Sequence, residues 1–484
     1  MNQTSNNPGD SFQTNSLKAY EPEISPDDIW GDDALGREQI AQSLTHLIEK
    51  QTDSFVVSLH GDWGTGKTFL LKRWQETLKK DGFEAIYFNA WEDDFCPDPL
   101  VAIIGQLSEE LESNSEHEFK VDDVKEKAEL LFRKIADGLT KKYTGISLEK
   151  ISETLKNHAL DSYHEQIKYK NELRNALTDI SAEVRKKTNR PLVFIIDELD
   201  RCRPLFAIEL LERIKHIFDV PNMVFVLGVN RAELCQSLKS IYGEIDADVY
   251  FRRFFDMEFI LPEADGGKFC EHLMNHYKVR DMFLGDKTNT NDNRNYPPSS
   301  FDSFQSIFRR LDLSLRDMDY CIRSIVFFGE KSRGGFDMYL FSLLMLAILR
   351  LKEPNLYREF IKGKCPVNEV LDCIDALIVD KSKDRDYEDF KLALLWSEAL
   401  FYHLDSQINP DTNNAFDELI NWEDGSVLNS PRFSKKTRTS NPDRIAQLRS
   451  VAQTWAKSMS YHKNFYAFAK LLELTETPTK KRQQ

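Results

Sequence analysis

The amino-acid sequence predicts an α/β protein with a central parallel β-sheet flanked by helices, a helical insertion and an α-helical C-terminal region. Short apolar runs at residues 54–59, 192–196 and 223–229 each lead into glycine or polar residues, which is typical of strands buried in a parallel sheet. Between and after these runs the hydrophobic pattern is mostly helical. A chain of 484 residues, 41% of them hydrophobic, is long enough for a large core and for two or three domains.

The composition argues against several classes of protein. A formal net charge of −15 disfavours a protein that coats DNA, although it is compatible with a local basic groove. The seven cysteines form no C-x-x-C pair and the N-terminus has no signal-peptide pattern, so we expect a reduced, cytoplasmic protein. The most apolar helical run, residues 339–351, is too short to span a bilayer and contains Arg350, so we expect no transmembrane segment.

The most informative stretch is a glycine-rich loop at residues 61–68, which fits the pattern G-x-x-x-x-G-K-[ST] at every fixed position. It follows a predicted strand and precedes a predicted helix. In such a loop the backbone N–H groups surround phosphate oxygens, Lys67 adds a positive charge and Thr68 binds Mg²⁺. A glycine-rich turn that binds nothing needs neither of these side chains. The expected nucleotide-binding residues are Gly61, Asp62, Trp63, Gly64, Thr65, Gly66, Lys67, Thr68 and Phe69.

A second chemical centre directly follows the apolar run at residues 192–196. Asp197, at the end of this predicted strand, is expected to hold Mg²⁺ through water, together with Thr68. Glu198 is expected to point at the attacking water and to act as general base. An acidic pair after a strand is weak evidence by itself. In the same chain as the glycine-rich loop, it predicts a P-loop ATPase with ATP and Mg²⁺ as cofactors.

Polar residues close to these two centres have alternative roles. Asn230, at the end of the third apolar run, either orients the attacking water or caps the following helix, and the two roles are compatible. Arg201 and Arg203 either reach the nucleotide of a neighbouring subunit or pair internally with Asp200 and Glu209. The internal pairing is slightly favoured.

Two further arginines are candidates for stabilising charge on the transferred phosphoryl group. Arg253 lies among aromatic residues just before a predicted edge strand, where it is either an arginine finger for a neighbouring protomer or a surface arginine stacked on phenylalanine. Arg316 begins a helix of the C-terminal region, where it either contacts the γ-phosphate or pairs with Asp317 or Asp319. The catalytic candidates are therefore Glu198, Lys67, Asn230, Arg253 and Arg316.

Four segments, in this order, resemble the KAP family of P-loop NTPases, in the additional-strand (STAND/AAA-like) class. They are residues 61–68 (Gly-Asp-Trp-Gly-Thr-Gly-Lys-Thr), 88–91 (Phe-Asn-Ala-Trp), 195–202 (Ile-Ile-Asp-Glu-Leu-Asp-Arg-Cys) and 251–254 (Phe-Arg-Arg-Phe). The resemblance covers residues 33–262 well and the remainder loosely. It implies a P-loop ATPase whose relatives include bacterial phage-exclusion proteins and animal membrane-associated signalling scaffolds.

The sequence departs from this family in two places. Many relatives carry transmembrane helices between the phosphate loop and the acidic strand, where this chain has the polar stretch 113–190. We therefore do not expect this chain to share the membrane association of those relatives. The family also tends to have aspartate where this chain has Asn230, which weakens the proposed role of Asn230 toward the attacking water.

The pattern along the chain predicts a domain organisation. The predicted parts are a disordered N-terminus at residues 1–16, a P-loop NTPase core at 17–112 and 191–265, a helical insertion at 113–190, and an α-helical lid and C-terminal domain at 266–484 with a flexible loop at 285–300. The helix leading through residues 33–48 either lines the adenine pocket or is an ordinary packing helix. Basic stretches at 423–444 and 480–482 either meet nucleic acid or an acidic partner, or are solvated surface charge.

The sequence contains no H-E-x-x-H motif and no G-x-S-x-G elbow, so we expect no second catalytic centre. An ATPase of this kind usually acts on another protein. We expect a homo-oligomer whose nucleotide cycle drives assembly or switching and controls a separate effector protein, and the family resemblance suggests bacterial antiphage defence. The alternatives are a non-hydrolysing ATP-binding scaffold or signalling module, and a nucleic-acid-stimulated motor.

Overall fold

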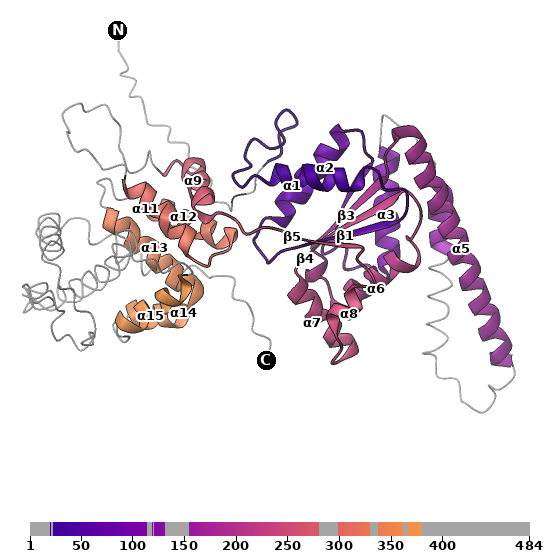
Figure 1. Ribbon diagram of the computed structural model, residues 1–484. Helices are drawn as coiled ribbons and strands as arrows, with labels where there is room; N and C mark the ends of the chain where they lie inside the picture. Colours follow the sequence, from indigo (N-terminus) through magenta and orange to yellow (C-terminus); the bar gives the residue numbers. More distant parts are fainter. Residues whose placement is uncertain are drawn as a thin grey trace, which may run out of the picture. The chain divides into compact units, whose positions relative to one another are not determined.

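The computed structural model describes residues 20, 23–113, 119, 121–130, 154–279, 299–329, 337–361, 365 and 367–378 (Figure 1). The chain divides into two compact units, one formed by Pro22–Glu263 and the other by Met1–Glu21 with Ala264–Gln484. The first unit contains the glycine-rich loop and the acidic strand. The predicted disordered N-terminus at residues 1–16 and the basic stretches at 423–444 and 480–482 lie outside the described residues.

The first unit is built on a five-stranded parallel sheet in the order β2-β3-β4-β1-β5, which confirms the predicted fold class. The strands are β1 Phe55–His60, β2 Ala85–Asn89, β3 Leu192–Asp197, β4 Met223–Val229 and β5 Met257–Ile260. β3 and β4 are buried along their whole length, as their continuous apolar runs predict, whereas β5 is the exposed edge strand. β4 lies between β3 and β1, so the carboxyl ends of these three strands meet at one edge of the sheet.

Helices cover both faces of this sheet (Figure 1). Because alternate strand residues point to opposite faces, the core divides into two clusters. One cluster joins α1 and α2 to Val57, Val193 and Val224, and the other joins α3, α5, α6 and α7 to Phe194 and Phe225. The helices of this unit are α1 Arg37–Ile48, α2 Lys67–Lys80, α3 Pro99–Ser113, α5 Thr154–Thr188, α6 Pro204–His216, α7 Arg231–Tyr242 and α8 Ala247–Phe251.

The stretch predicted as a helical insertion contains the 35-residue helix α5. The C-terminal part of α5 buries Leu173, Leu177, Ile180 and Val184 in the core cluster on the α3 side of the sheet. The insertion is therefore anchored to the sheet by the half of α5 that leads directly into β3. Within the described residues no helix is both long enough and apolar enough to cross a lipid bilayer.

The second unit is helical in its described part, apart from an isolated bridge between Leu311 and Ile378. Its helices are α9 Gly266–His276, α11 Ser299–Arg310, α12 Leu315–Gly329, α13 Asp337–Lys352, α14 Pro354–Ile361 and α15 Val367–Leu377. α9 approaches α11 so closely that a Cβ at Gly266 would lie 2.4 Å from the carbonyl oxygen of Phe308. The predicted flexible loop 285–300 lies outside the described residues except for its last two residues, which begin α11.

Candidate nucleotide-binding site

The glycine-rich loop connects β1 to α2, as the sequence predicts. Gly64 and Gly66 have φ values of 81° and 92°, in the left-handed region that side chains other than glycine rarely adopt. Gly66 is the N-cap of α2, so the free N–H groups of the first helical turn open onto the loop. This strand-loop-helix arrangement is the geometry in which backbone N–H groups and the helix N-terminus bind phosphate.

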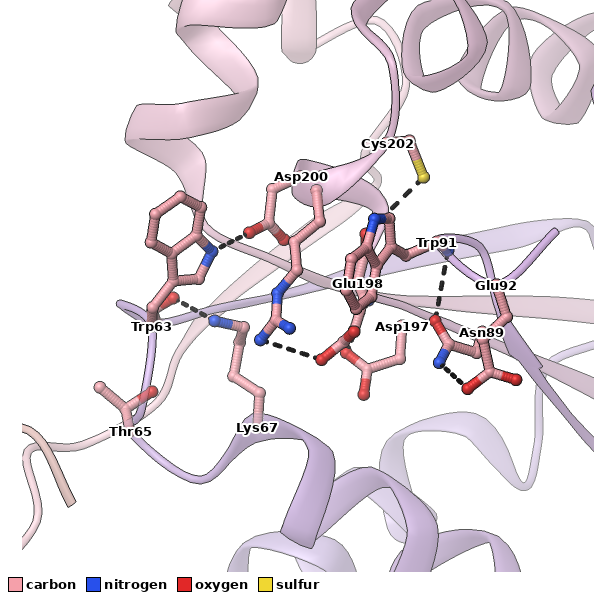
Figure 2. A network of polar contacts seen from close by, with 12 residues as sticks. Trp63, Thr65, Lys67, Asn89, Trp91, Glu92, Asp197, Glu198, Asp200 and Cys202 are labelled. Carbon is pink, nitrogen blue, oxygen red and sulfur yellow. Dashed lines mark hydrogen bonds and ion pairs between the residues drawn. The ribbon is translucent and has the colours of Figure 1, made fainter. Parts of the chain in front are cut away.

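Lys67 is the first residue of α2, and its side chain is directed back over the loop (Figure 2). Its Nζ donates hydrogen bonds to the carbonyl oxygens of Gly61 at 2.5 Å and Asp62 at 3.1 Å. The residue is 8% exposed, and burial lowers the pKa of Lys67, while the negative charges of Asp200 and Asp197 oppose this effect. The ammonium group is therefore held between the phosphate loop and the acidic end of β3.

Asp197 ends β3 and is buried, with 1% of its surface exposed. Its Oδ1 accepts the N–H of Glu198 at 2.8 Å, and its Oδ2 accepts the hydroxyl of Tyr87 at 2.9 Å. Burial and the charge of Asp197 raise the pKa of Tyr87, so the tyrosine is a neutral donor. Tyr87 was not among the predicted site residues. No local sequence pattern marked it, because its contact with Asp197 depends on the pairing of β2 with β3.

Gly228, on β4, lies directly against the Asp197 carboxylate, on the side of the neighbouring strand β4. A Cβ at this glycine would lie 2.8 Å from Asp197 Oδ1 and 2.5 Å from Leu71 Cδ1, both closer than real side chains approach. β4 therefore needs a glycine at the point where it passes the carboxylate. Tyr87 on one neighbouring strand and Gly228 on the other fix where the Asp197 side chain lies.

Glu198 has a left-handed backbone conformation, with φ 60° and ψ 24°. Its carbonyl accepts the N–H of Arg201 at 3.0 Å, and its Oε1 forms an ion pair with Arg201 Nη2, also at 3.0 Å. Both arginines therefore pair within the chain, as the favoured alternative predicts, but the predicted partners Asp200 and Glu209 are wrong. Arg201 pairs with Glu198, and Arg203 binds Asp94 in the loop after β2.

Asp200 instead connects the two halves of the site. Its Oδ2 accepts the indole N–H of Trp63, in the phosphate loop, at 2.5 Å (Figure 2). Asp200 is 7% exposed, and its Oδ1 has no hydrogen-bond partner among the described residues. Trp63, the second variable residue of the glycine-rich loop, is thus hydrogen-bonded to the segment that follows the acidic strand.

Asn230 directly follows β4, between the acidic end of β3 and the phosphate loop. Its side-chain oxygen accepts the N–H of Ala232 at 3.1 Å, so it is the N-cap of α7. The capping role of Asn230 is therefore present in the structure. Its role toward an attacking water stays a prediction.

The two arginine candidates lie just after α8 and in the first turn of α12. Arg252 and Arg253 are exposed at the end of α8, while the neighbouring Phe254 and Phe255 are buried. Arg316 lies in the first turn of α12, in the other unit. The two carboxylates proposed as its surface partners bind elsewhere: Asp317 to Lys352 at 2.8 Å and Asp319 to Arg323 at 2.8 Å.

The segment before β1 contacts the phosphate loop through Arg37. Arg37, the first residue of α1, is buried and donates to the carbonyl oxygens of Thr65 at 3.2 Å and Pro262 at 3.0 Å. Burial lowers the pKa of Arg37, and Asp33 acts in the opposite direction. No local sequence pattern indicates these contacts, which join residues far apart in the chain.

Phe69, the last predicted nucleotide-binding residue, lies in the first turn of α2 next to half-buried Thr68. The guanidinium carbon of Arg73 lies 3.8 Å from the centroid of the Phe69 ring, and the ring of Trp30 meets it edge-on at 6.4 Å. An aromatic ring at the start of this helix is thus already packed by residues of α2 and of the segment before α1.

Comparisons with known proteins bear on this arrangement. The model of the KAP family P-loop domain matches residues 37–332, which is more than half of the chain. No curated protein gives a significant match. Solved structures with similarity include the Aeropyrum pernix ORC2 protein in ADPNP and ADP complexes, with 14% identity and a TM-score of 0.32 over 79% of this chain and 88% of that chain.

AMPPCP-bound DnaA from Aquifex aeolicus is similar at 11% identity, with a TM-score of 0.29 over 94% of this chain and 97% of that chain. The family match covers the phosphate loop, the acidic strand and the two arginines that follow α8. The chain belongs to the KAP family of P-loop NTPases.

Proposed function

We propose that this site binds Mg-ATP and hydrolyses it to ADP and phosphate. The observation that carries the proposal is the convergence of Lys67, in the phosphate loop, with the carboxylates of Asp197 and Asp200 at the end of the acidic strand. The strand order β3-β4-β1 brings the phosphate loop and the acidic strand to the same edge of the sheet. The negative charges of Asp200 and Asp197 raise the pKa of Lys67, against the larger effect of burial, which supports placing the three residues in one site.

The loop suits the triphosphate of a nucleotide. The first N–H groups of α2 and the left-handed glycines of the loop offer donors to phosphate oxygens, and the buried ammonium of Lys67 adds a positive charge. When phosphate binds, its oxygens replace the carbonyl oxygens of Gly61 and Asp62 as acceptors for Lys67. A charged acceptor makes the stronger hydrogen bond.

Thr68 and Asp197 are the residues that would hold Mg²⁺. Asp197 fits this role because its carboxylate is fixed by Tyr87 and by a backbone N–H at the end of β3. Among the described residues no cluster of three or more His, Cys, Asp or Glu side chains is arranged to hold a metal. A magnesium ion that takes most of its ligands from water and phosphate needs no such cluster. When bound, the ion would neutralise charge that develops on the phosphates.

Glu198 is the proposed general base. Its carboxylate would take a proton from the water that attacks the γ-phosphorus, and Asn230 at the end of the next strand would help to orient that water. The ion pair with Arg201 occupies one oxygen of this base. The same ion pair favours the second candidate function, an ATP-binding scaffold or signalling module that hydrolyses ATP slowly or not at all.

The test of nucleotide binding is the variant Lys67→Ala. We expect it to lose binding of ATP and turnover, because the phosphates lose the positive charge of the loop. Lys79→Ala is a matched control near the end of the same helix, where Lys79 forms a surface pair with Glu110. Wild-type ATP binding by Lys67→Ala, measured by calorimetry, would contradict the assignment.

The wider role extends this proposal. We propose that the nucleotide cycle of a cytoplasmic homo-oligomer controls a separate effector protein in bacterial antiphage defence. The exposed Arg252 and Arg253, close to exposed Val249 on α8, support an interface between protomers. In cells that carry the gene with its neighbours, phage plating should drop, and Lys67→Ala should restore it. Equal plating with and without the wild-type gene would contradict the defence role.

A further inference from the structure

Arg201 lies between the two chemical centres of the site. Its guanidinium pairs with Glu198 Oε1 at 3.0 Å, and its central carbon lies 5.6 Å from the centroid of the Trp91 ring. Its positive charge is also close enough to Lys67 to act on the pKa of that residue, after the larger effects of burial, Asp200 and Asp197. An arginine in this place faces both the proposed base and the proposed phosphate site.

In this ion pair Glu198 is poorly suited to act as a base. A carboxylate oxygen that accepts hydrogen bonds from a guanidinium holds its electron pairs toward that cation, and a proton from water competes with the cation for them. The γ-phosphate of ATP carries more negative charge than a carboxylate, and a guanidinium binds phosphate oxygens through two parallel hydrogen bonds. The phosphate is therefore a stronger partner for Arg201 than Glu198 is.

The backbone conformation of Glu198 is linked to the segment that carries Arg201, so the two residues can change partners together. A left-handed conformation is unfavourable for a residue other than glycine, and Glu198 adopts it. Hydrogen bonds offset this cost, because the carbonyl of Glu198 accepts from the N–H of Arg201 and from the thiol of Cys202. The conformation of the base is thus coupled to the short 3-10 helix Leu199–Arg201 that carries the arginine.

We propose that Arg201 contacts the γ-phosphate of the nucleotide bound to its own chain and that this contact releases Glu198. The inference rests on the proposed function of the site. With ADP, Arg201 stays on Glu198. With ATP, Arg201 binds the γ-phosphate, and the freed Glu198 takes a proton from the attacking water. A bond forms between the water oxygen and the γ-phosphorus, and the bond from the γ-phosphorus to the bridging oxygen breaks, so ADP leaves with that oxygen.

Trp91 gives this exchange an optical signal. Trp91 is 52% exposed and lies in the loop after β2, where its backbone N–H donates to Asn89 Oδ1 at 3.2 Å. A cation near the face of an indole ring changes the electrostatic environment of the ring. When Arg201 moves to the phosphate, the cation leaves Trp91, so the fluorescence of Trp91 reports the position of Arg201.

The experiment compares the affinities of ADP and of AMP-PNP, a non-hydrolysable ATP analogue, in the presence of Mg²⁺. The variants are Arg201→Ala, Arg201→Lys and the matched control Arg203→Ala, which removes an exposed arginine bound to Asp94. We expect Arg201→Ala to lose roughly tenfold or more in AMP-PNP affinity and to keep wild-type ADP affinity, since the lost contact is to the γ-phosphate. Arg201→Lys should keep part of the preference for AMP-PNP, and Arg203→Ala all of it.

The second readout is tryptophan emission. In wild-type protein AMP-PNP should change the emission more than ADP does, and this difference should disappear in both Trp91→Phe and Arg201→Ala. Equal weakening of both nucleotides in Arg201→Ala would identify a structural role and overturn the inference. So would an unchanged preference for AMP-PNP. If wild-type protein bound neither nucleotide, the proposed function itself would fail. Tight binding of both nucleotides by wild-type protein, with the preference for AMP-PNP unchanged in Arg201→Ala, would overturn only the role of Arg201.

Discussion

The hydroxyl group of Tyr87 provides the sharpest test of how the magnesium site is built. Tyr87→Phe removes the donor that binds Asp197 Oδ2 at 2.9 Å and leaves the ring in place. Asp197 is almost fully buried, so little water reaches the oxygen to replace the lost donor. A hydrogen bond to a charged group contributes about 1.5–3 kcal/mol, and about 1.4 kcal/mol corresponds to a factor of ten in an equilibrium constant.

We therefore expect Tyr87→Phe to need about ten times more free Mg²⁺ for half-maximal ATP turnover, because a loosely held carboxylate binds the hydrated ion less well. The assay is turnover against free Mg²⁺ at saturating ATP. Tyr277→Phe is the matched control, since its hydroxyl donates to Asp319 at 2.7 Å in the other unit. It should lower stability and leave the Mg²⁺ dependence alone. A wild-type Mg²⁺ dependence of Tyr87→Phe would refute the reasoning.

Three further predictions concern other parts of the first unit. Gly228→Ala should lower the free energy of unfolding by about 1–3 kcal/mol in chemical denaturation, and should weaken turnover as well, because the new methyl group collides with Asp197. Burial lowers the pKa of His60, so the folded state keeps it neutral while the unfolded chain binds a proton below pH about 6.5. Stability should fall as pH drops from 7 to 5, and His60→Gln should show a smaller fall in melting temperature. Arg253→Ala should bind ATP normally and turn it over slowly, and mixing it with Lys67→Ala should restore some activity if Arg253 acts in a neighbouring protomer.

The sheet and its chemical edge could be predicted because both depend on local patterns. The apolar runs that became β1, β3 and β4 are continuous, and each ends at a glycine or a polar residue. Buried parallel strands place such ends at one edge. For that reason the proximity of Lys67, Asp197 and Asn230 in the fold could be predicted from the sequence.

The partners of individual side chains could not be predicted in the same way. Asp200 and Glu209 were the internal partners expected for Arg201 and Arg203, but residues 199–201 form a 3-10 helix, in which side chains three positions apart lie above one another. This geometry brings Arg201 to Glu198. Pairs such as Trp63 with Asp200, 137 positions apart, depend on tertiary packing that no local pattern encodes.

The same limit explains Tyr87 and Arg37. Tyr87 reads as an ordinary strand residue until the pairing of β2 with β3 places its hydroxyl at Asp197. Arg37 reads as the first residue of an amphipathic helix until its contact with Thr65 appears. Both residues support the site through chain segments that are distant in sequence.

The measurement that tests the central claim most directly is ATP turnover by wild-type protein and by Glu198→Gln, with nucleotide binding measured on the same samples. Glutamine keeps the size of the side chain and removes the base. We predict Mg²⁺-dependent turnover by wild-type protein, and for Glu198→Gln intact ATP binding with turnover at least about 100-fold lower. Wild-type turnover by Glu198→Gln, or no turnover by wild-type protein that binds ATP, would contradict the account.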